Sequence, residues 1–95
     1  MKKRCYNQAV ENDLREAVLT DHARKQMRRR QLNEASVRAV LSKPEQILPV
    51  RAGRVVAQAI ADGFLVRVFV DVDRHPPEVV TVYRTRKIEK YRSQP

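Results

Sequence analysis

The stretch RVVAQAIADGFLVRVFVDV, residues 54–72, decides the fold because it contains two strand-like segments separated by a two-residue turn. Residues 54–61 and 64–72 are rich in valine, and β-branched and aromatic residues favour strands. Asp62-Gly63 between them is typical of a type I′ turn, which needs positive φ at both central positions. The sequence therefore predicts an antiparallel hairpin.

The predicted turn also fixes which residues share a face of this hairpin. It pairs Ala61 with Phe64 and, counting outward, Gln58 with Arg67. One face is then uniformly apolar, and we expect it to pack beneath helices; its members are Ala57, Ala59, Ala61, Phe64, Val66, Val68 and Val70. The opposite face is mixed, and we expect it to be an open surface; its members are Val56, Gln58, Ile60, Leu65, Arg67, Phe69 and Asp71.

The segments on both sides of the hairpin complete an α+β pattern. Periodic apolar residues predict helices over 7–19, over 21–30 with Thr20 or Asp21 as the cap, and from Asn33 to about Pro44. Residues 47–50 and 78–84 read as strands, and residues 85–95 as a basic tail or a short last helix. We therefore expect helices followed by an antiparallel sheet of about four strands. Residues 19–95 are predicted to form one domain, with 1–18 as an N-terminal extension.

Composition narrows the classes of function. The chain has 95 residues and a net charge of +9, which favours polyanions such as nucleic acid or an acidic protein as partners. The single cysteine, Cys5, cannot form an internal disulfide, and neither histidine has a second ligand at metal-binding spacing. With only two glycines there is no glycine-rich phosphate loop, and no apolar run reaches the roughly 20 residues that span a bilayer. We expect a soluble, cytoplasmic protein without metal or cofactor.

The residues with chemical potential are a histidine, arginines and strand hydroxyls. Metal-free RNA cleavage needs a base, an acid, and cations that stabilise charge on the phosphate. Histidine commonly serves as the base or the acid in such reactions, which makes His22 a candidate, and Arg30 lies roughly 12 Å further along the same predicted helix. In a meander, Arg67, Thr81 and Tyr83 project from adjacent strands. The same residues also suit a surface histidine, a solvated basic helix and ordinary sheet packing, and the residues alone leave both interpretations open.

Three segments carry a resemblance to a known family: HARKQMRRRQLNEASVRAVLSKPE at 22–45, GFLVRVFVDV at 63–72 and EVVTVYRTRKIEKY at 78–91. Together they resemble the family catalogued as domain of unknown function 4258, over roughly residues 19–91. The resemblance implies a RelE/barnase-like fold and nuclease activity, with His22, Arg30, Thr81 and Tyr83 on motif positions. Gln31 departs from the pattern, because a glycine is common there, and residues 1–18 lie outside the resemblance.

These observations lead to one predicted function and two alternatives. The prediction is a metal-independent endoribonuclease of the toxin type, which acts on RNA and is held by an acidic antitoxin protein. The predicted catalytic residues are His22, Arg30, Arg67, Thr81 and Tyr83. The predicted nucleic-acid-binding residues are Arg28, Arg29, Arg84, Arg86, Lys87 and Lys90. The alternatives are a non-catalytic RNA- or DNA-binding module and a protein-interaction domain that uses the open sheet face.

Overall fold

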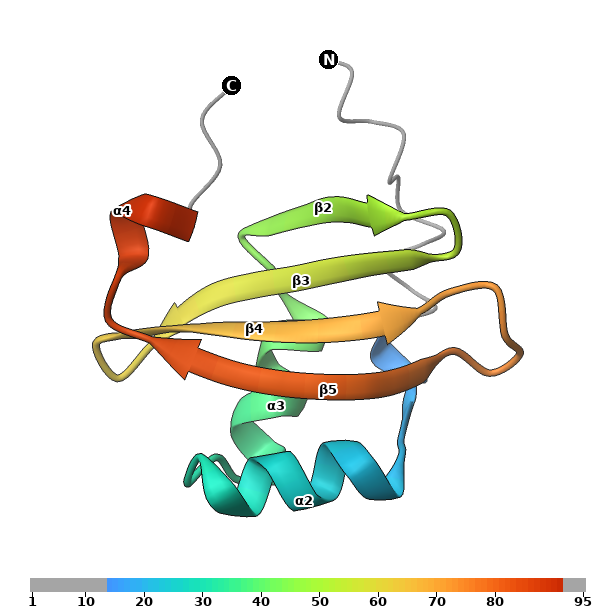
Figure 1. Cartoon of the computed structure of the whole chain (residues 1–95), viewed down its shortest axis with the longest axis horizontal. Helices are drawn as coiled ribbons and strands as arrows, with labels where there is room; N and C mark the ends of the chain where they lie inside the picture. The colour runs from blue at the N-terminus through green and yellow to red at the C-terminus, as the bar shows by residue number, and fades with distance from the viewer. Residues whose placement is uncertain (1–13, 92–95) are drawn as a thin grey trace.

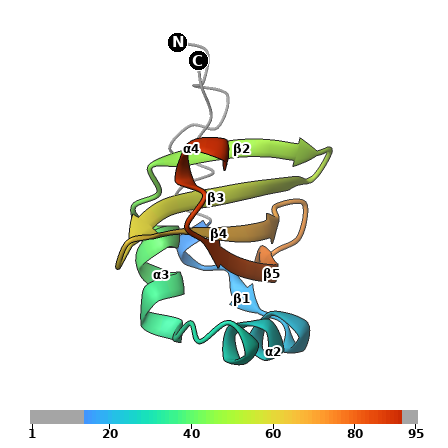
Figure 2. The ribbon, with the colours of Figure 1, turned by 60° about the vertical axis from the view of Figure 1, so that its left-hand side comes forward.

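The computed structural model describes residues 14–91 and shows an α+β fold built on one five-stranded sheet (Figure 1). The strands are β1 (Val18–Leu19), β2 (Gln46–Arg51), β3 (Arg54–Ala61), β4 (Phe64–Asp71) and β5 (Glu78–Thr85). The helices are α2 (Asp21–Arg29), α3 (Glu34–Ser42) and α4 (Ile88–Tyr91). The order of strands in the sheet is β1-β5-β4-β3-β2, so β2 to β5 form a meander. Figure 2 shows α2 and α3 below the strands, and α4 at the opposite end of the molecule.

The predicted hairpin is confirmed. Asp62 and Gly63 have φ angles of 53° and 80°, which is the conformation that a type I′ turn requires. β3 and β4 pair from Ala61 with Phe64, through Gln58 with Arg67, to Arg54 with Asp71. The turn chemistry therefore sets the register over the whole length of both strands.

Three features of the predicted sheet and helices need correction. The sheet is mixed rather than antiparallel, because β1 pairs in parallel with the start of β5. The helix predicted over 7–19 is wrong at Val18–Leu19, where the chain is extended; its first part lies outside the described residues. The amide of Val18 donates to the carbonyl of Pro77, and that of Thr20 to the carbonyl of Val79, so pairing with β5 satisfies these two backbone amides. The helices are also not confined to the N-terminal part, since α4 follows β5.

Helix ends follow the predicted capping chemistry. Thr20 caps α2 by accepting a hydrogen bond from the amide of Ala23, and Asn33 caps α3 by accepting one from the amide of Ser36. At the end of α2 the amide of Leu32 donates to the carbonyl of Met27, and the amide of Gln31 to that of Arg28. This pair of bonds is a Schellman motif with Gln31 at the left-handed position. None of the described helices is long and apolar enough to cross a membrane.

The core lies between the sheet and the helices, as the hairpin pattern predicts. Buried members of the apolar face are Ala57, Ala59, Val66, Val68 and Val70. They pack with apolar residues of α2, α3 and β5, namely Ala23, Met27, Val37, Val40, Leu41, Val79 and Val82. Leu14 and Ala17, which precede β1, are buried in the same core. A bulge at Val80 explains why Val79 and Val82, three residues apart, both face inward.

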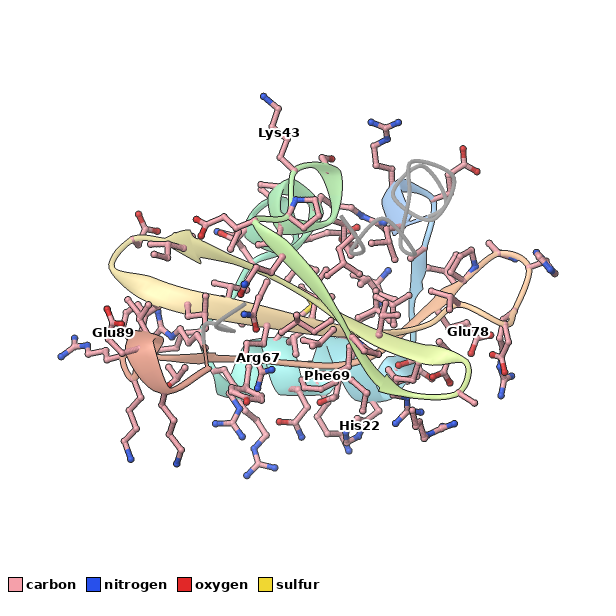
Figure 3. All side chains as sticks on the ribbon, turned by 90° about the horizontal axis from the view of Figure 1, so that it is seen from above. His22, Lys43, Arg67, Phe69, Glu78 and Glu89 are labelled. Atoms are coloured by element: carbon pink, nitrogen blue, oxygen red, sulfur yellow. The ribbon has the colours of Figure 1, made fainter. Side chains whose placement is uncertain are left out.

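The opposite face of the hairpin is less open than predicted. Val56 and Leu65 are buried, and so is Gln58, whereas Ile60 alone among the described apolar residues of this face is clearly exposed. Val56 lies between Leu48 of β2 and Phe69 of β4 in the register, so larger cross-strand neighbours cover it. The strong twist of the sheet, seen where β2 crosses the strands beneath it in Figure 3, brings such neighbours closer.

Candidate functional site

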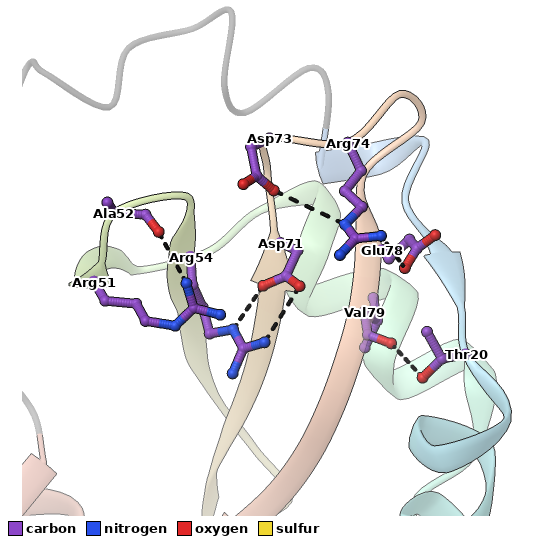
Figure 4. Close-up of polar contacts among 9 residues, drawn as sticks. All are labelled: Thr20, Arg51, Ala52, Arg54, Asp71, Asp73, Arg74, Glu78 and Val79. Atoms are coloured by element: carbon purple, nitrogen blue, oxygen red, sulfur yellow. Dashed lines mark hydrogen bonds and ion pairs between the residues drawn. The ribbon is translucent and has the colours of Figure 1, made fainter.

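Helix α2 runs along the free edge of β5 and is attached to it at both ends. At its start, the hydroxyl of Thr20 donates to the carbonyl of Val79 at 2.8 Å (Figure 4). At its end, Arg84 donates to the side-chain oxygen of Gln31 at 3.4 Å. Between these contacts α2 and β5 run in the same direction. The first turn of α2 therefore lies beside the first part of β5, and the last turn of α2 lies beside the last part of β5.

A row of polar side chains crosses four strands on the face away from α3. Arg67 in β4 is at its centre: its Nε donates to the amide oxygen of Gln58 at 2.8 Å, and its Nη1 donates to the phenol oxygen of Tyr83 at 2.6 Å. Gln58 in turn donates from Nε2 to the amide oxygen of Gln46 at 2.7 Å. The residues are direct register partners on β2, β3, β4 and β5. The row therefore fixes the guanidinium plane of Arg67 and the position of the Tyr83 hydroxyl.

Aromatic rings and a second arginine complete this centre. The rings of Phe69 and Tyr83 stack with centroids 5.9 Å apart. The Cζ of Arg67 lies 5.5 Å from the Phe69 centroid and 5.6 Å from that of Tyr83. Arg30, which follows the last turn of α2, has its Cζ 6.0 Å from the Tyr83 centroid. Arg30 and Arg67 come from different elements and meet at one phenol ring, where cation–π attraction favours both.

An open cavity of about 210 Å³ adjoins this centre at the end of α2. It is lined by Arg29, Arg30, Gln31, Phe64 and Arg84. The guanidinium of Arg84 lies 4.2 Å from the Phe64 ring centroid, and that of Arg86 lies 4.9 Å from it. Within residues 14–91, no ion pair joins any of these arginines to a carboxylate. The cavity wall is therefore strongly positive and suited to an anion.

The structure brings some of the predicted site residues together and leaves others apart. Arg30, Arg67 and Tyr83 meet, and Arg29, Arg84 and Arg86 gather near Phe64. Figure 3 shows His22 on the same side of the molecule as Arg67 and Phe69. His22 is exposed in the first turn of α2, and its side chain makes no hydrogen bond or ion pair with another described residue.

The remaining predicted residues lie around this arrangement. Thr81 is half-buried on β5 opposite Phe69, two positions before Tyr83 and on the same face. Arg28 is exposed on α2, and Lys87 and Lys90 are exposed after the end of β5.

The sequence reasoning missed the neutral residues that hold the arginines. Gln58 was paired correctly with Arg67, but it was not recognised as the acceptor that orients the guanidinium. Gln46 could have been found only by extending the register to β2. Phe64 was predicted to be buried in the core; it is half-buried, with its ring beside Arg84 and Arg86.

An ion pair lies on the same face of the hairpin as Arg67, at the end far from the Asp62-Gly63 turn. Arg54 donates from Nε and Nη2 to the two carboxylate oxygens of Asp71, at 2.6 and 3.2 Å (Figure 4). These hydrogen bonds, and the attraction of the guanidinium charge, hold the pKa of Asp71 below its usual range despite burial. The described residues contain no group of three or more His, Cys, Asp or Glu side chains that could hold a metal ion.

Comparison with known proteins gives a single finding. Residues 19–84 match the model of the family described as Domain of unknown function (DUF4258), which covers more than half of the chain. The match extends from the strand before α2 to Arg84 in β5, so it includes both arginines at Tyr83 and every residue of the cavity wall. No curated protein and no solved structure matches the chain.

Proposed function

The chain belongs to the family described as Domain of unknown function (DUF4258), and from the geometry of its site we propose that it is a metal-independent endoribonuclease of the toxin type. The observation that carries this proposal is the convergence of Arg30 and Arg67 on Tyr83, beside a cavity walled by further arginines. Two guanidinium groups next to a hydroxyl can stabilise the charge that develops in phosphoryl transfer without a metal, and hydrogen bonds to Gln58 and Tyr83 hold that of Arg67 in place. A RelE/barnase-like fold and nuclease activity, which the family resemblance of the sequence implies, are part of this proposal.

In the proposed reaction the ribose 2′-oxygen attacks the adjacent phosphorus. The bond from phosphorus to the 5′-oxygen of the next nucleotide breaks, which leaves a 2′,3′-cyclic phosphate and a 5′-hydroxyl. Arg30 and Arg67 stabilise the negative charge that collects on the phosphate oxygens. His22 removes the 2′-hydroxyl proton or delivers a proton to the leaving 5′-oxygen, and solvent water takes part in the other of these two proton transfers. Tyr83 supplies a hydroxyl near the reacting phosphate, and Thr81 positions this hydroxyl.

The course of the RNA strand follows from the position of α2. Because α2 and β5 run side by side in the same direction, His22 and Thr81 lie toward the start of this pair of elements, and Arg30 and Tyr83 lie toward its end. Arg28, Lys87 and Lys90 would then contact the phosphate backbone beyond the reacting group. An acidic antitoxin protein would cover the same positive surface.

The direct test is incubation of the purified protein with RNA in excess EDTA, followed by mapping of the ends. We expect cyclic-phosphate and 5′-hydroxyl ends. His22→Ala and Arg30→Ala should each lower the rate by about 10²–10⁴. Arg24→Ala is the matched control, because Arg24 pairs with Glu34 on α3 and should retain full activity. Absence of cleavage by the parent protein would exclude the proposal.

A non-catalytic RNA-binding module is the second candidate, and the exposure of His22 favours it. In that case the same arginines hold phosphates and no bond breaks. Both candidates predict RNA affinity that falls steeply with salt, since each neutralised phosphate releases counterions. Only cleavage of RNA in the presence of EDTA distinguishes the two candidates. The third candidate, a protein-interaction domain, would have less apolar surface on the sheet face than the sequence predicts, because Val56 and Leu65 are buried.

A further inference from the structure

We propose that the cavity at the end of α2 is a phosphate-binding subsite for the nucleotide next to the reacting one in single-stranded RNA. This inference rests on the proposed function, because it assigns the Arg67–Tyr83 centre to the reacting phosphate. The wall of the cavity combines the guanidinium groups of Arg29, Arg30 and Arg84 with the amide of Gln31. Guanidinium groups bind phosphate by charge-assisted, often bidentate, hydrogen bonds.

Arg84 is held in place from two sides. Its guanidinium lies 4.2 Å from the Phe64 ring centroid, and one of its nitrogens donates to the Gln31 oxygen at 3.4 Å. Both partners are neutral, so they restrict the side chain without cancelling its charge. A cation that is ordered before the anion arrives loses less entropy on binding. Gln31 and Phe64 therefore act as positioning residues for Arg84.

The backbone conformation of Gln31 supports its role in positioning Arg84. Its φ of +58° is in the left-handed region, at the position of the Schellman motif where glycine is the favoured residue. Glycine would relieve the strain but would lack the amide that contacts Arg84. The glutamine side chain therefore contributes a contact with Arg84 in the cavity wall, while its backbone strain destabilises the end of α2.

Arg30 connects the cavity to the reaction centre. It lines the cavity, and its Cζ also lies 6.0 Å from the Tyr83 centroid. By the alternation along the strands, Phe64 and Arg84 project toward the helix side of the sheet, and Tyr83 toward the opposite side. A nucleic acid that contacts both places must turn around the edge of β5. A single strand is flexible enough for this path, whereas a regular duplex is not.

The variants Gln31→Gly, Gln31→Asn and Arg84→Gln test the subsite, with Arg74→Gln as a control that removes one exposed positive charge far from it. Two probes separate the phosphate positions: a dinucleoside monophosphate, which has one phosphate, and a trinucleoside diphosphate, which has two. Non-cleavable 2′-deoxy forms of both allow affinity to be measured. Arg84→Gln should weaken the longer probe about tenfold and the shorter one less than twofold. It should also lower the salt slope for a longer strand by about one. Arg74→Gln should change neither.

Gln31→Gly is the sharpest variant because two measurements should move in opposite directions. Its unfolding temperature should rise by about 2–8 °C, since the strain at the helix end is relieved. Its affinity for the longer probe should fall about threefold. Gln31→Asn tolerates the same backbone but is too short to reach Arg84, so it should show the same loss of affinity. A purely structural Gln31 would leave affinity unchanged in both variants, and that result would overturn the inference.

The outcomes also distinguish this inference from the proposed function. If the parent protein cleaves RNA and Arg84→Gln binds both probes like the parent, the subsite is excluded and the endoribonuclease stands. If the parent does not cleave RNA but Arg84→Gln selectively weakens the longer probe, the cavity still binds a second phosphate and only the catalytic proposal fails.

Discussion

Arg54 and Arg67 lie on the same hairpin and the same face of the sheet, yet their surroundings differ in chemistry. Arg54 is bound through two nitrogens to the carboxylate of Asp71. Arg67 donates to the phenol of Tyr83 and the amide of Gln58. A carboxylate neutralises the guanidinium that it binds, whereas a phenol oxygen and an amide oxygen orient a guanidinium without themselves neutralising it. The first arrangement stabilises the fold, and the second is suited to an anion.

The largest effect should come from a comparison of two single variants, in which Arg67 or Arg54 is replaced by lysine. Lysine keeps the positive charge but lacks the planar guanidinium group. A lysine at 67 cannot donate to Gln58 and Tyr83 in the same geometry, so Arg67→Lys should slow RNA cleavage by about 10²-fold. A lysine at 54 can still pair with Asp71, so Arg54→Lys should cleave at the parent rate and lose less than about 1 kcal/mol of stability. Cleavage assays and denaturant unfolding measure the two effects. Equal cleavage by both variants would remove the distinction between the two arginines.

The second effect is on stability and is specific to the Arg54–Asp71 pair. Asp71→Asn should lower the free energy of unfolding by about 1–3 kcal/mol at pH 7, because it leaves Arg54 without its carboxylate. The pKa of Asp71 is lowered in the folded state, so its contribution is fully present above the unfolded value of about 3.9 and disappears as the pH falls through the folded value.

The difference in stability between the parent and Asp71→Asn should therefore shrink as the pH is lowered below about 4. Urea unfolding at several pH values measures it. Asp73→Asn is the control, since Asp73 is exposed and its contact with Arg74 is 4.0 Å long. A difference that stays constant with pH would show that the carboxylate charge of Asp71 does not stabilise the fold.

A third change acts on both arginines at once, through the turn that sets their register. Gly63 has a φ of +80°, and a Cβ at this position would meet nothing within 4 Å, so backbone strain is the main cost of a side chain. Gly63→Val should lower stability by about 1–2 kcal/mol, because a β-branched residue tolerates positive φ poorly. Gly63→Asn should lose much less. An unchanged melting temperature in Gly63→Val would mean that this turn does not limit the stability of the hairpin.

The hairpin also shows how far the sequence could predict this molecule. Asp62-Gly63 and the alternating valines were sufficient to derive the strands, their register and the pairing of Gln58 with Arg67, because turn and strand chemistry are local. The parallel pairing of Val18–Leu19 with β5 was not predicted, since a contact between segments about 60 residues apart leaves no local periodicity. The alternating pattern predicts that the mixed face is open, yet Val56, Gln58 and Leu65 on it are buried. Burial there depends on cross-strand neighbours and on sheet twist, which the pattern of one hairpin does not contain.

The candidate site was predictable to a similar degree. The meander placed Arg67 next to Tyr83, and the helix placed Arg30 at the far end from His22. What the sequence could not supply is the direction of long side chains. The contacts of Arg30 with Tyr83 and of Arg84 with Phe64 depend on where α2 lies beside β5, which is set by tertiary contacts such as the Thr20–Val79 bond.

The smallest effect should come from the outer end of the polar row, and it tests whether the neutral acceptors orient Arg67 as a connected set. Gln46 is linked to Arg67 through Gln58, whose amide must point its oxygen at Arg67 when its nitrogen donates to Gln46. Gln46→Ala removes the acceptor that favours this orientation, and the cost in stability should be about 0.5–1.5 kcal/mol. Cleavage should fall only a few fold, with the effect on kcat rather than KM, since Gln46 touches no substrate. In the background of Arg67→Lys the same change should have no further effect on kcat, because the geometry it protects is already lost. Additive effects of the two changes would show that Gln46 stabilises β2 independently, and that the row across the sheet does not act as a unit.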